Sequence, residues 1–384
     1  MPVTTLTTTG VQYSGIWTMP QVNAAIAAGT WTGLPQLYSW GTNADGALGL
    51  NNTTSYSSPK QVGLLTWKVI AGAVNFTTAI KSDNTIWSWG NNAQGQLGLG
   101  NTTNYSSPKQ IGALTNWLNV ASGGYGFTVA SKTDGTLWSW GGGVAGRLGL
   151  GNITNYSSPK QVGALTNWLK VACGDAFTLA TKSDGTLWAW GQNNAGQLGL
   201  ANRTFYSSPK QVGSLTTWLQ ISAKYTVASS VKSDGTLWTW GNNASGQLGL
   251  GNRTYYSSPK QVGSLTTWSI ISLNTSNAVA TKSNGELWTW GANNNGQLGI
   301  GNTTNYSSPK QVGSLTTWSN ITSGIRETLA TKTNGTLWSW GNNTYGQLGL
   351  GNTTFYSSPK QVGSLTTWLT LASGQYFTIA IATT

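Results

Sequence analysis

The sequence has 384 residues, of which only 7% are charged, and its formal net charge is +12. It contains no histidine and a single cysteine, which excludes an internal disulfide and removes the usual general base and the commonest metal ligand. No hydrophobic run approaches the length of a membrane span, and the N-terminus lacks the basic start and apolar stretch of a signal peptide, so we expect neither membrane insertion nor standard export. The 51 glycines and 22 tryptophans favour an all-β protein rich in turns.

Residues 1–36 precede the first repeat, and we expect them to form an N-terminal attachment or packing segment. Within them, residues 19–29 predict a short helix that begins near Pro20. Two stretches beside that helix, 14–18 and 28–31, resemble a short element of structural and tail-fibre proteins of marine bacteriophages. This resemblance implies a virion protein.

Residues 37–384 consist of one unit repeated seven times. A Trp-Gly pair and a Ser-Pro-Lys-Gln run recur together at a near-constant spacing of about 50 residues. The tryptophans of the pair are Trp40, Trp89, Trp140, Trp190, Trp240, Trp290 and Trp340. A period of this length with strand-like content predicts a propeller or a β-solenoid.

One repeat shows why strands are expected. Residues 176–181 are strand-like, Asp184-Gly185 supplies a tight hairpin turn, and residues 186–190 return with two tryptophans on one face. Pro209 marks an edge strand, because proline cannot donate to a central ladder. Each repeat therefore has room for about four short strands, the content of a propeller blade.

The two ends of the chain complement each other. The last repeat stops at residues 377–382, which match the first strand of the hairpin, and the matching second strand is missing there. That strand occurs instead at residues 37–41. We therefore predict an all-β, seven-bladed β-propeller closed by pairing of its N- and C-terminal strands, which leaves no exposed sheet edge inside the ring.

The repeat motif resembles the regulator-of-chromosome-condensation repeat. Residues 131–163 and 331–363 carry almost the whole pattern: Asp-Gly-Thr-Leu-Trp-Ser-Trp-Gly, Asn-Asn-x-x-Gly-Gln-Leu-Gly-Leu-Gly-Asn and Ser-Pro-x-x-Val. The resemblance implies a seven-bladed propeller. The family usually has histidine before a Thr or Ser where this chain has Phe76, Phe127, Phe177 and Phe377. Its founding member is an exchange factor for a small GTPase that uses acidic loop residues, and the eight acidic residues here are too few to transfer that site.

The informative positions are those at which near-identical repeats differ. One such segment lies just before each hairpin, so these segments are expected to gather at one end of the central channel. The candidate partner-binding residues there are Asn75, Tyr125, Asp175, Lys224, Tyr225, Asn274, Arg326, Glu327 and Tyr376. A second variable loop adds Arg203 and Arg253. Tyr, Arg and Asn are typical of recognition surfaces, and relaxed constraint on exposed loops is the alternative explanation.

The residues that recur without variation are better explained by structure. Blade packing accounts for the periodic tryptophans more simply than light sensing or sugar stacking does. The lysines of the seven Ser-Pro-Lys-Gln runs fit a solvated rim, with an anionic partner as the alternative. They are Lys60, Lys109, Lys160, Lys210, Lys260, Lys310 and Lys360. Turn chemistry explains the Asp-Gly pairs, and Cys173 is expected to be a small core residue.

These observations favour a non-enzymatic binding or structural propeller, with no catalytic residues, metal or cofactor. The leading hypothesis is a phage virion protein in a tail fibre or on a capsid, for attachment or host-surface recognition. Its partners would be other virion proteins or a host surface glycan or protein, with a homo-oligomer within a particle as a further expectation; nucleic acid is not expected. The alternative is a protein-binding propeller in the cytoplasm, either an exchange-factor-like regulator or a hydrolase inhibitor.

Overall fold

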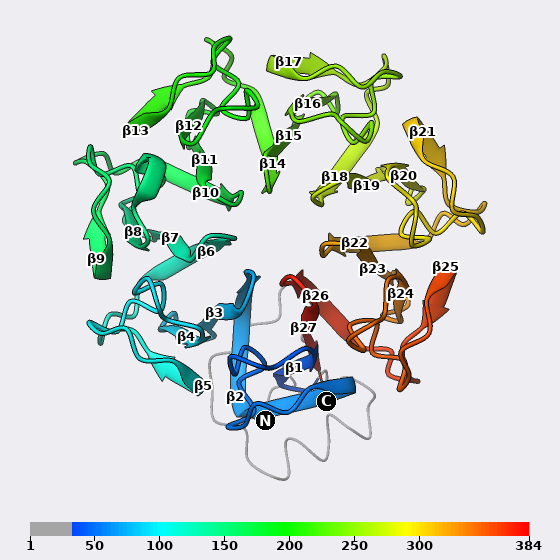
Figure 1. Cartoon of the computed structure of the whole chain (residues 1–384), viewed down its shortest axis with the longest axis horizontal. Helices are drawn as coiled ribbons and strands as arrows, with labels where there is room; N and C mark the ends of the chain where they lie inside the picture. Colours follow the sequence, from blue (N-terminus) through cyan, green and yellow to red (C-terminus); the bar gives the residue numbers. More distant parts are fainter. Residues whose placement is uncertain (1–32, 384) are drawn as a thin grey trace, which may run out of the picture.

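Seven blades stand around a central axis in the computed structural model, which describes residues 33–383 (Figure 1). Five sheets contain four strands each, and one sheet contains seven. The larger sheet is two blades joined by β2 (Tyr56–Gly72). The first half of β2 is the outermost strand of one blade, and its second half is the innermost strand of the next. The predicted seven-bladed β-propeller is therefore confirmed.

Most of the predicted N-terminal attachment segment, residues 1–36, lies outside the described residues, and the helix predicted for residues 19–29 lies wholly outside them. Within the described part of the chain, the helical structure is a three-residue 3-10 turn, η1 (Val144–Gly146). All other regular elements between residues 33 and 383 are strands.

The four antiparallel strands of each blade are counted here from the axis outward. The first strands are β6 (Trp117–Gly123), β10 (Trp168–Cys173), β14 (Trp218–Lys224), β18 (Trp268–Leu273), β22 (Trp318–Ser323), β26 (Trp368–Ser373) and the second half of β2. The second strands are β3 (Phe76–Lys81), β7 (Phe127–Lys132), β11 (Phe177–Lys182), β15 (Val227–Lys232), β19 (Asn277–Lys282), β23 (Glu327–Lys332) and β27 (Phe377–Thr383). The third strands are β1 (Pro35–Gly41), β4 (Ile86–Gly90), β8 (Leu137–Gly141), β12 (Leu187–Gly191), β16 (Leu237–Gly241), β20 (Leu287–Gly291) and β24 (Leu337–Gly341). The fourth strands are β5 (Tyr105–Gln110), β9 (Tyr156–Gln161), β13 (Tyr206–Gln211), β17 (Tyr256–Gln261), β21 (Tyr306–Gln311), β25 (Tyr356–Gln361) and the first half of β2.

The closing blade is built from both ends of the described chain. Strand β1 pairs with β27 from Pro35 opposite Thr383 to Gly41 opposite Phe377 without a register shift. On its other side β1 pairs with β2. This confirms the predicted split blade, in which hydrogen bonds rather than a continuous chain close the ring.

Each hairpin turn between the second and third strands has a recurring hydrogen-bond chain. A carboxylate oxygen of Asp184 accepts from the backbone N–H and the hydroxyl of Thr186, at 2.9 and 2.6 Å, and the indole N–H of Trp188 donates to that hydroxyl oxygen at 3.0 Å. These hydrogen bonds lower the pKa of Asp184 below its ordinary value. The arrangement confirms the interpretation of the Asp-Gly pairs as turn residues.

The core lies between blades, and the third-strand tryptophans hold it together. The indole N–H of Trp190 donates to the carbonyl of Arg147 in the preceding blade at 3.0 Å, and the ring lies edge-on to Trp168. The same bond to the preceding blade recurs at Trp40, Trp89, Trp140, Trp240, Trp290 and Trp340. A Cβ at Gly149 would lie 2.7 Å from the indole nitrogen of Trp190, so glycine is required at this close approach. The predicted packing role of the periodic tryptophans is confirmed.

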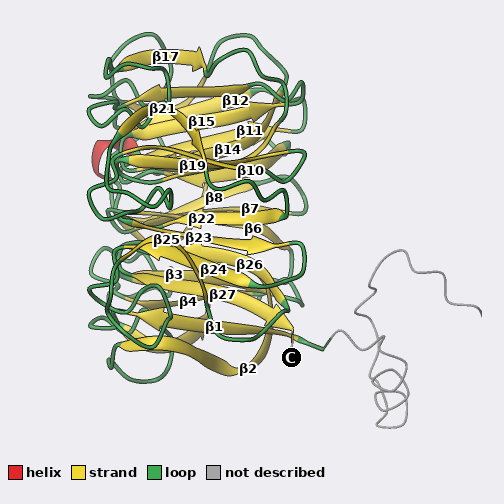
Figure 2. Ribbon diagram, turned by 90° about the vertical axis from the view of Figure 1, so that its right-hand side faces the viewer, coloured by secondary structure: helices red, strands yellow, loops and turns green. Residues whose placement is uncertain are grey.

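The two ends of the ring carry different connections (Figure 2). The inner turns join the first and second strands, the outer loops join the third and fourth, and both lie at what we call the mouth end. The backbone N–H of Gln192 in an outer loop donates to the carbonyl of Ala176 in an inner turn at 2.9 Å. The hairpin turns and the linkers between blades lie at the opposite, hairpin end, where the N–H of Ser183 donates to the carbonyl of Asn167 at 2.9 Å.

The indole bonds between blades can be tested by comparing Trp→Phe variants. The carbonyl that accepts from Trp190 also accepts from the hydroxyl of Thr178, whereas the carbonyl of Gln197 accepts from Trp240 and has no such second donor among the described residues. Trp240→Phe should therefore lower the free energy of unfolding by about 2–4 kcal/mol, and Trp190→Phe by about 1 kcal/mol less. Urea denaturation measures both. Trp238→Phe, whose indole bonds within its own hairpin, is the control, and equal losses in all three variants would contradict the role of the bonds between blades.

Candidate binding site at the mouth of the central channel

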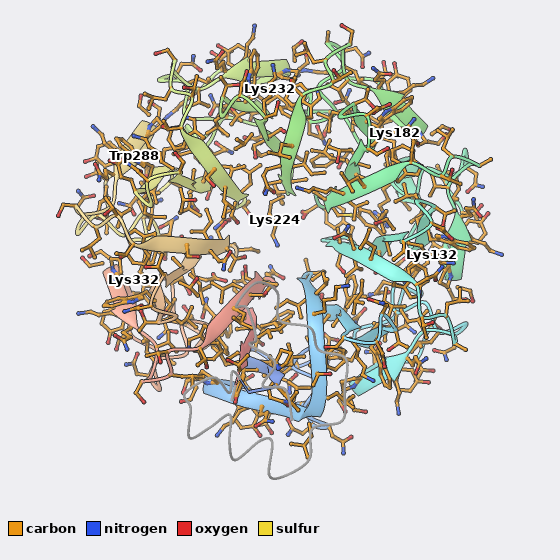
Figure 3. The ribbon with its side chains drawn as sticks, turned by 180° about the vertical axis from the view of Figure 1, so that it is seen from behind. Lys132, Lys182, Lys224, Lys232, Trp288 and Lys332 are labelled. Carbon is orange, nitrogen blue, oxygen red and sulfur yellow. The ribbon has the colours of Figure 1, made fainter. Side chains whose placement is uncertain are left out.

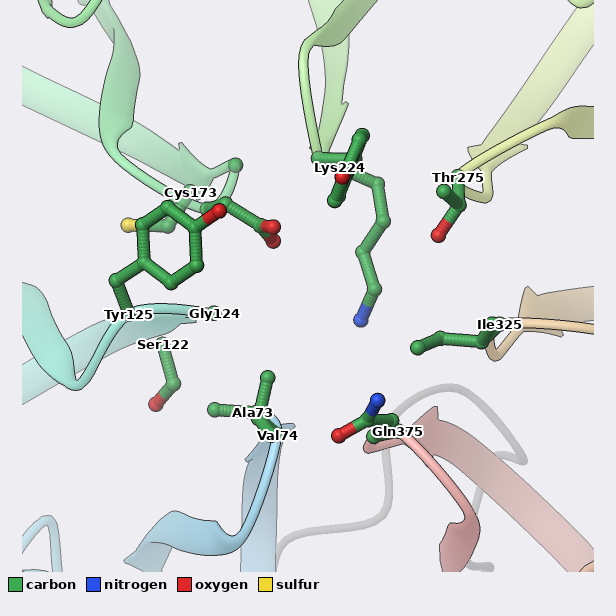
Figure 4. A pocket seen from close by; sticks show the side chains of 13 residues that line it. Ala73, Val74, Ser122, Gly124, Tyr125, Cys173, Lys224, Thr275, Ile325 and Gln375 are labelled. Carbon is green, nitrogen blue, oxygen red and sulfur yellow. The ribbon is translucent and has the colours of Figure 1, made fainter.

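The inner turns of all seven blades converge on the axis and line a pocket of about 230 Å³ (Figure 4). Four of the predicted residues line it: Tyr125, Asp175, Lys224 and Tyr225. The expectation that the variable segments gather at one end of the channel is therefore confirmed. The fold places each variable segment there, because the turn between the first and second strands of a blade lies close to the axis.

Backbone hydrogen bonds between blades tie neighbouring inner turns together. The N–H of Tyr125 donates to the carbonyl of Asp175 at 3.0 Å, and the N–H of Asp175 donates to the carbonyl of Tyr225 at 3.0 Å. Main-chain atoms therefore hold three successive turns, while their side chains are free to differ. The residues that vary most in sequence are displayed on a fixed backbone.

The other predicted residues of the inner-turn segments lie near the pocket without lining it. The amide of Asn75 donates to the carboxylate of Asp45 at 2.8 Å. Tyr376 packs against Tyr345 with ring centroids 4.7 Å apart. In two further blades the neighbours of the predicted residues line the pocket in their place: Thr275 beside Asn274, and Ile325 beside Arg326 and Glu327.

Arg203 and Arg253 do not line the pocket. Both are exposed on outer loops that lead to fourth strands, so they lie at the mouth end but farther from the axis. The sequence placed them at equivalent positions of the repeat, but only the strand order shows that this position belongs to the rim.

Two opposite charges face the pocket from neighbouring blades. Burial raises the pKa of Asp175 to about 6, and the cations of Lys224 and Arg147 act in the opposite direction. Burial lowers the pKa of Lys224, which Asp175 and Glu327 partly offset. In Figure 3 Lys224 lies at the centre of the ring, whereas Lys182 and Lys232 lie among the blades, where their amines sit over tryptophan rings.

Glu327 occupies a position that holds phenylalanine in four other blades. Phe177 fills this site in its blade, and a Cβ at Gly174 would lie 2.0 Å from that ring. Glu327 is 0% exposed, and its Oε1 has no hydrogen-bond partner among the described residues. Burial raises the pKa of Glu327 to about 8. A carboxylic acid therefore stands in the core, and it is mostly protonated at neutral pH.

The sequence reasoning missed two residues of this region. Arg147 is 4% exposed, its Nε donates to the carbonyl of Gly142 at 2.6 Å, and burial lowers its pKa to about 10. Tyr345 is exposed at the mouth end beside Tyr376. Arg147 was detectable, because it replaces the glutamine of the Gly-Gln-Leu-Gly motif, whereas Tyr345 stands in a loop that varies in every repeat.

Other predicted features also have defined places. The seven rim lysines are exposed on the fourth strands, and each amine lies 5.1–5.6 Å from the ring centre of a tyrosine. Cys173 is buried, as predicted, and its thiol pKa is raised. Between residues 33 and 383 there is no group of three His, Cys, Asp or Glu side chains placed to hold a metal, and no helix there has the length and apolarity to cross a membrane.

Comparison with known families matches most of the chain. A family model described as RCC1-like domain matches residues 20–277. The regulator of chromosome condensation (RCC1) repeat matches residues 284–330 and 334–381. No curated protein sequence matches the chain.

Solved structures show the same fold at low sequence identity. Human WBSCR16 is 20% identical with a TM-score of 0.82, over 91% of this chain and 99% of that protein. Prp20p from Saccharomyces cerevisiae is 19% identical with a TM-score of 0.80, over 92% of each chain. The yeast RCC1 (Prp20) bound to Kap60 gives 19% identity and a TM-score of 0.78, over 99% of this chain and 96% of that one. None of these similarities supports the virion role, which stays a prediction from the N-terminal segment.

The buried acid predicts a pH dependence of stability. The folded pKa of Glu327, about 8, lies above its ordinary value of 4.5, so the folded state holds a proton that the unfolded state has lost. Stability should therefore fall as pH rises from about 4.5 to 8, by at most about 1.4 kcal/mol per pH unit. Asp175 contributes in the same direction below pH 6, so measurements between pH 6 and 8 leave out most of its contribution.

Urea denaturation of the wild type and of Glu327→Gln between pH 6 and 8 measures this effect. The variant should lose most of the slope, and Glu327→Phe, which restores the aromatic residue of other blades, should also be more stable than the wild type at pH 8. Identical slopes in the wild type and Glu327→Gln would show that the acid does not titrate in this range.

Proposed function

Because this chain belongs to the RCC1-like domain family, we propose that it is a non-enzymatic propeller that binds a protein partner over its mouth end. The observation that carries the proposal is the distribution of sequence variation. The repeats are nearly identical at the hairpin end and in the core, and they differ in the inner turns that surround the pocket. A surface that differs from blade to blade can present a unique pattern, which a sevenfold-repeated surface cannot.

The exposed side chains around the pocket have the chemistry of a protein interface. Tyr125 and Tyr225 are 52% and 40% exposed, and Tyr345 and Arg326 are also exposed at the mouth end. Tyrosine and arginine are enriched among residues that dominate binding energy, because they combine large contact area with hydrogen-bonding groups. Backbone bonds already order the inner turns that carry Tyr125 and Tyr225, so little backbone conformational entropy is lost there on binding.

Related structures support a protein as the partner. The yeast protein Prp20p binds Gsp1p and histones, and its structure was also solved in complex with Kap60. These partners are partners of Prp20p, and at 19% sequence identity the similarity shows only that the two proteins share a fold. The proposal for this chain takes from them only the class of partner.

The finer roles, an exchange-factor-like regulator or a hydrolase inhibitor, depend on the partner's identity. The acidic residues give little support to exchange activity. Asp83, Asp134, Asp184, Asp234 and Glu286 lie in hairpin turns at the end away from the pocket. At the mouth end, Glu327 is buried, which leaves few carboxylates at the pocket.

Cross-linked affinity capture with matched variants tests the proposal. A mouth variant combines Tyr125→Ala with Tyr225→Asn, where asparagine suits the positive φ of 52° at residue 225. The control combines Leu165→Ala with Leu215→Ala, two linker residues at the hairpin end that are 49% and 45% exposed. A partner captured by the wild type and the control should be lost at least tenfold in the mouth variant.

Two outcomes would overturn the proposal. Equal capture of all partners by the mouth variant would show that binding does not use this end. Loss in the control alone would place the interface at the hairpin end. Thermal denaturation of each variant excludes unfolding as the cause of any loss.

A further inference from the structure

Lys224 is the cationic side chain among the residues that line the pocket. Lys224, at the end of β14, extends from its blade into the middle of the pocket, and its amine lies at the centre of the view in Figure 4. Its Nζ donates to the carbonyl of Ser373 in a blade across the channel at 3.4 Å, a long hydrogen bond. The ammonium group therefore lies in the channel mouth, and its hydrogen bond to the protein is weak.

No carboxylate pairs with this amine. Within the described part of the chain, the ion pairs closer than 4.0 Å are Lys81 with Asp83 and Lys282 with Glu286. Removal of an ammonium group from water is unfavourable unless a partner compensates. The protein thus leaves a partly buried cation without an ion-pair partner at the centre of its most variable surface.

The local charge balance favours an anionic ligand. Arg147 is a second cation of this region, and its Nε is already bound to the carbonyl of Gly142. Glu327 is mostly protonated at neutral pH because its pKa is about 8, which leaves Asp175 as the acid facing Lys224. Arg326, exposed at the mouth, adds further positive charge. Cations therefore outnumber ionised acids around the pocket.

The size of the pocket limits the ligand. At about 230 Å³ it is smaller than the roughly 300–1,000 Å³ of typical small-molecule sites. Ala73, Val74 and Ile325 form apolar walls, and the amide of Gln375 adds a polar group beside the amine. Such a pocket has room for one acidic side chain or chain end with its aliphatic part against the walls.

We propose that the pocket receives a carboxylate of the protein partner, from a Glu or Asp side chain or a C-terminus, which pairs with the Nζ of Lys224. This inference rests on the proposed function and specifies the chemistry of its central contact. The exposed tyrosines around the pocket contact the surrounding surface of the partner, and the lysine selects for an acid at its centre.

Peptide titration followed by NMR tests the pocket alone. The probe is acetyl-Gly-Glu-Gly-amide, added to the full ¹⁵N-labelled chain, and the reporters are the backbone amides of Gly124 and Gly174, which line the pocket. The expected result is a saturable shift in the millimolar range, at least tenfold weaker for the glutamine peptide. Lys224→Met should abolish the response, and Lys224→Arg should retain it.

The control for net charge is Lys260→Met, which removes an exposed rim lysine on β17 of the same blade. An equal response to both peptides, or an unchanged response in Lys224→Met, would overturn the proposal. Acetate that binds as tightly as the glutamate peptide would identify a site for free small acids and overturn the assignment to a protein partner. Thermal denaturation confirms that each variant is folded.

The two proposals fail in different ways. If peptides bind but no partner depends on Tyr125 and Tyr225 in the capture experiment, the proposed function fails. If a partner depends on those tyrosines but no carboxylate peptide binds, the proposed function stands and the role of Lys224 is wrong.

Discussion

The structure depends on one hydrogen bond that is repeated around the ring. A third-strand tryptophan, such as Trp190, donates its indole N–H to a carbonyl of the preceding blade, here that of Arg147. The bond fixes the distance and angle between blades, and the glycine above the indole allows the outer loop to approach it closely. The same contact occurs at all seven blade interfaces, including the one at Trp40 in the closing blade, so the closing interface is built like the other six. The edge-on tryptophan pairs then fill the space between sheets.

This repeated framework separates stability from recognition. The core and the hairpin end carry the packing and the turn chemistry, so they are copied from blade to blade. Three successive inner turns are held together by main-chain bonds such as that from Tyr125 to Asp175, which any side chain permits. Their side chains can therefore differ without weakening the ring. A site at the axis also has contributions from all blades, so that a single pocket can combine an amine, a carboxyl group, a phenol and apolar walls.

The departures from the repeat in the core have an energetic cost. Glu327 and Asn277 stand where other blades place an aromatic ring, and both have side-chain polar atoms without hydrogen-bond partners among the described residues. Unpartnered buried polar atoms are unfavourable, and stable propellers can carry a few of them because their closure and core are extensive. Both lie next to the inner turns, close to the proposed binding site. The buried polar atoms without partners at these two residues therefore lie beside the part of the surface that differs between blades.

Much of this protein was decided by its sequence alone. The repeat spacing, the Asp-Gly turns and the complementary strands at residues 37–41 and 377–382 determined the blade count and the closure, because these signals are local and occur in every repeat. The gathering of the variable segments at one end also followed from periodicity. The sequence could not show that Lys224 reaches across the channel to Ser373, that Glu327 is buried whereas Arg326 beside it is exposed, or that Arg203 lies on the rim. Those facts depend on distances between blades and on the direction of single side chains, which only the closed ring determines.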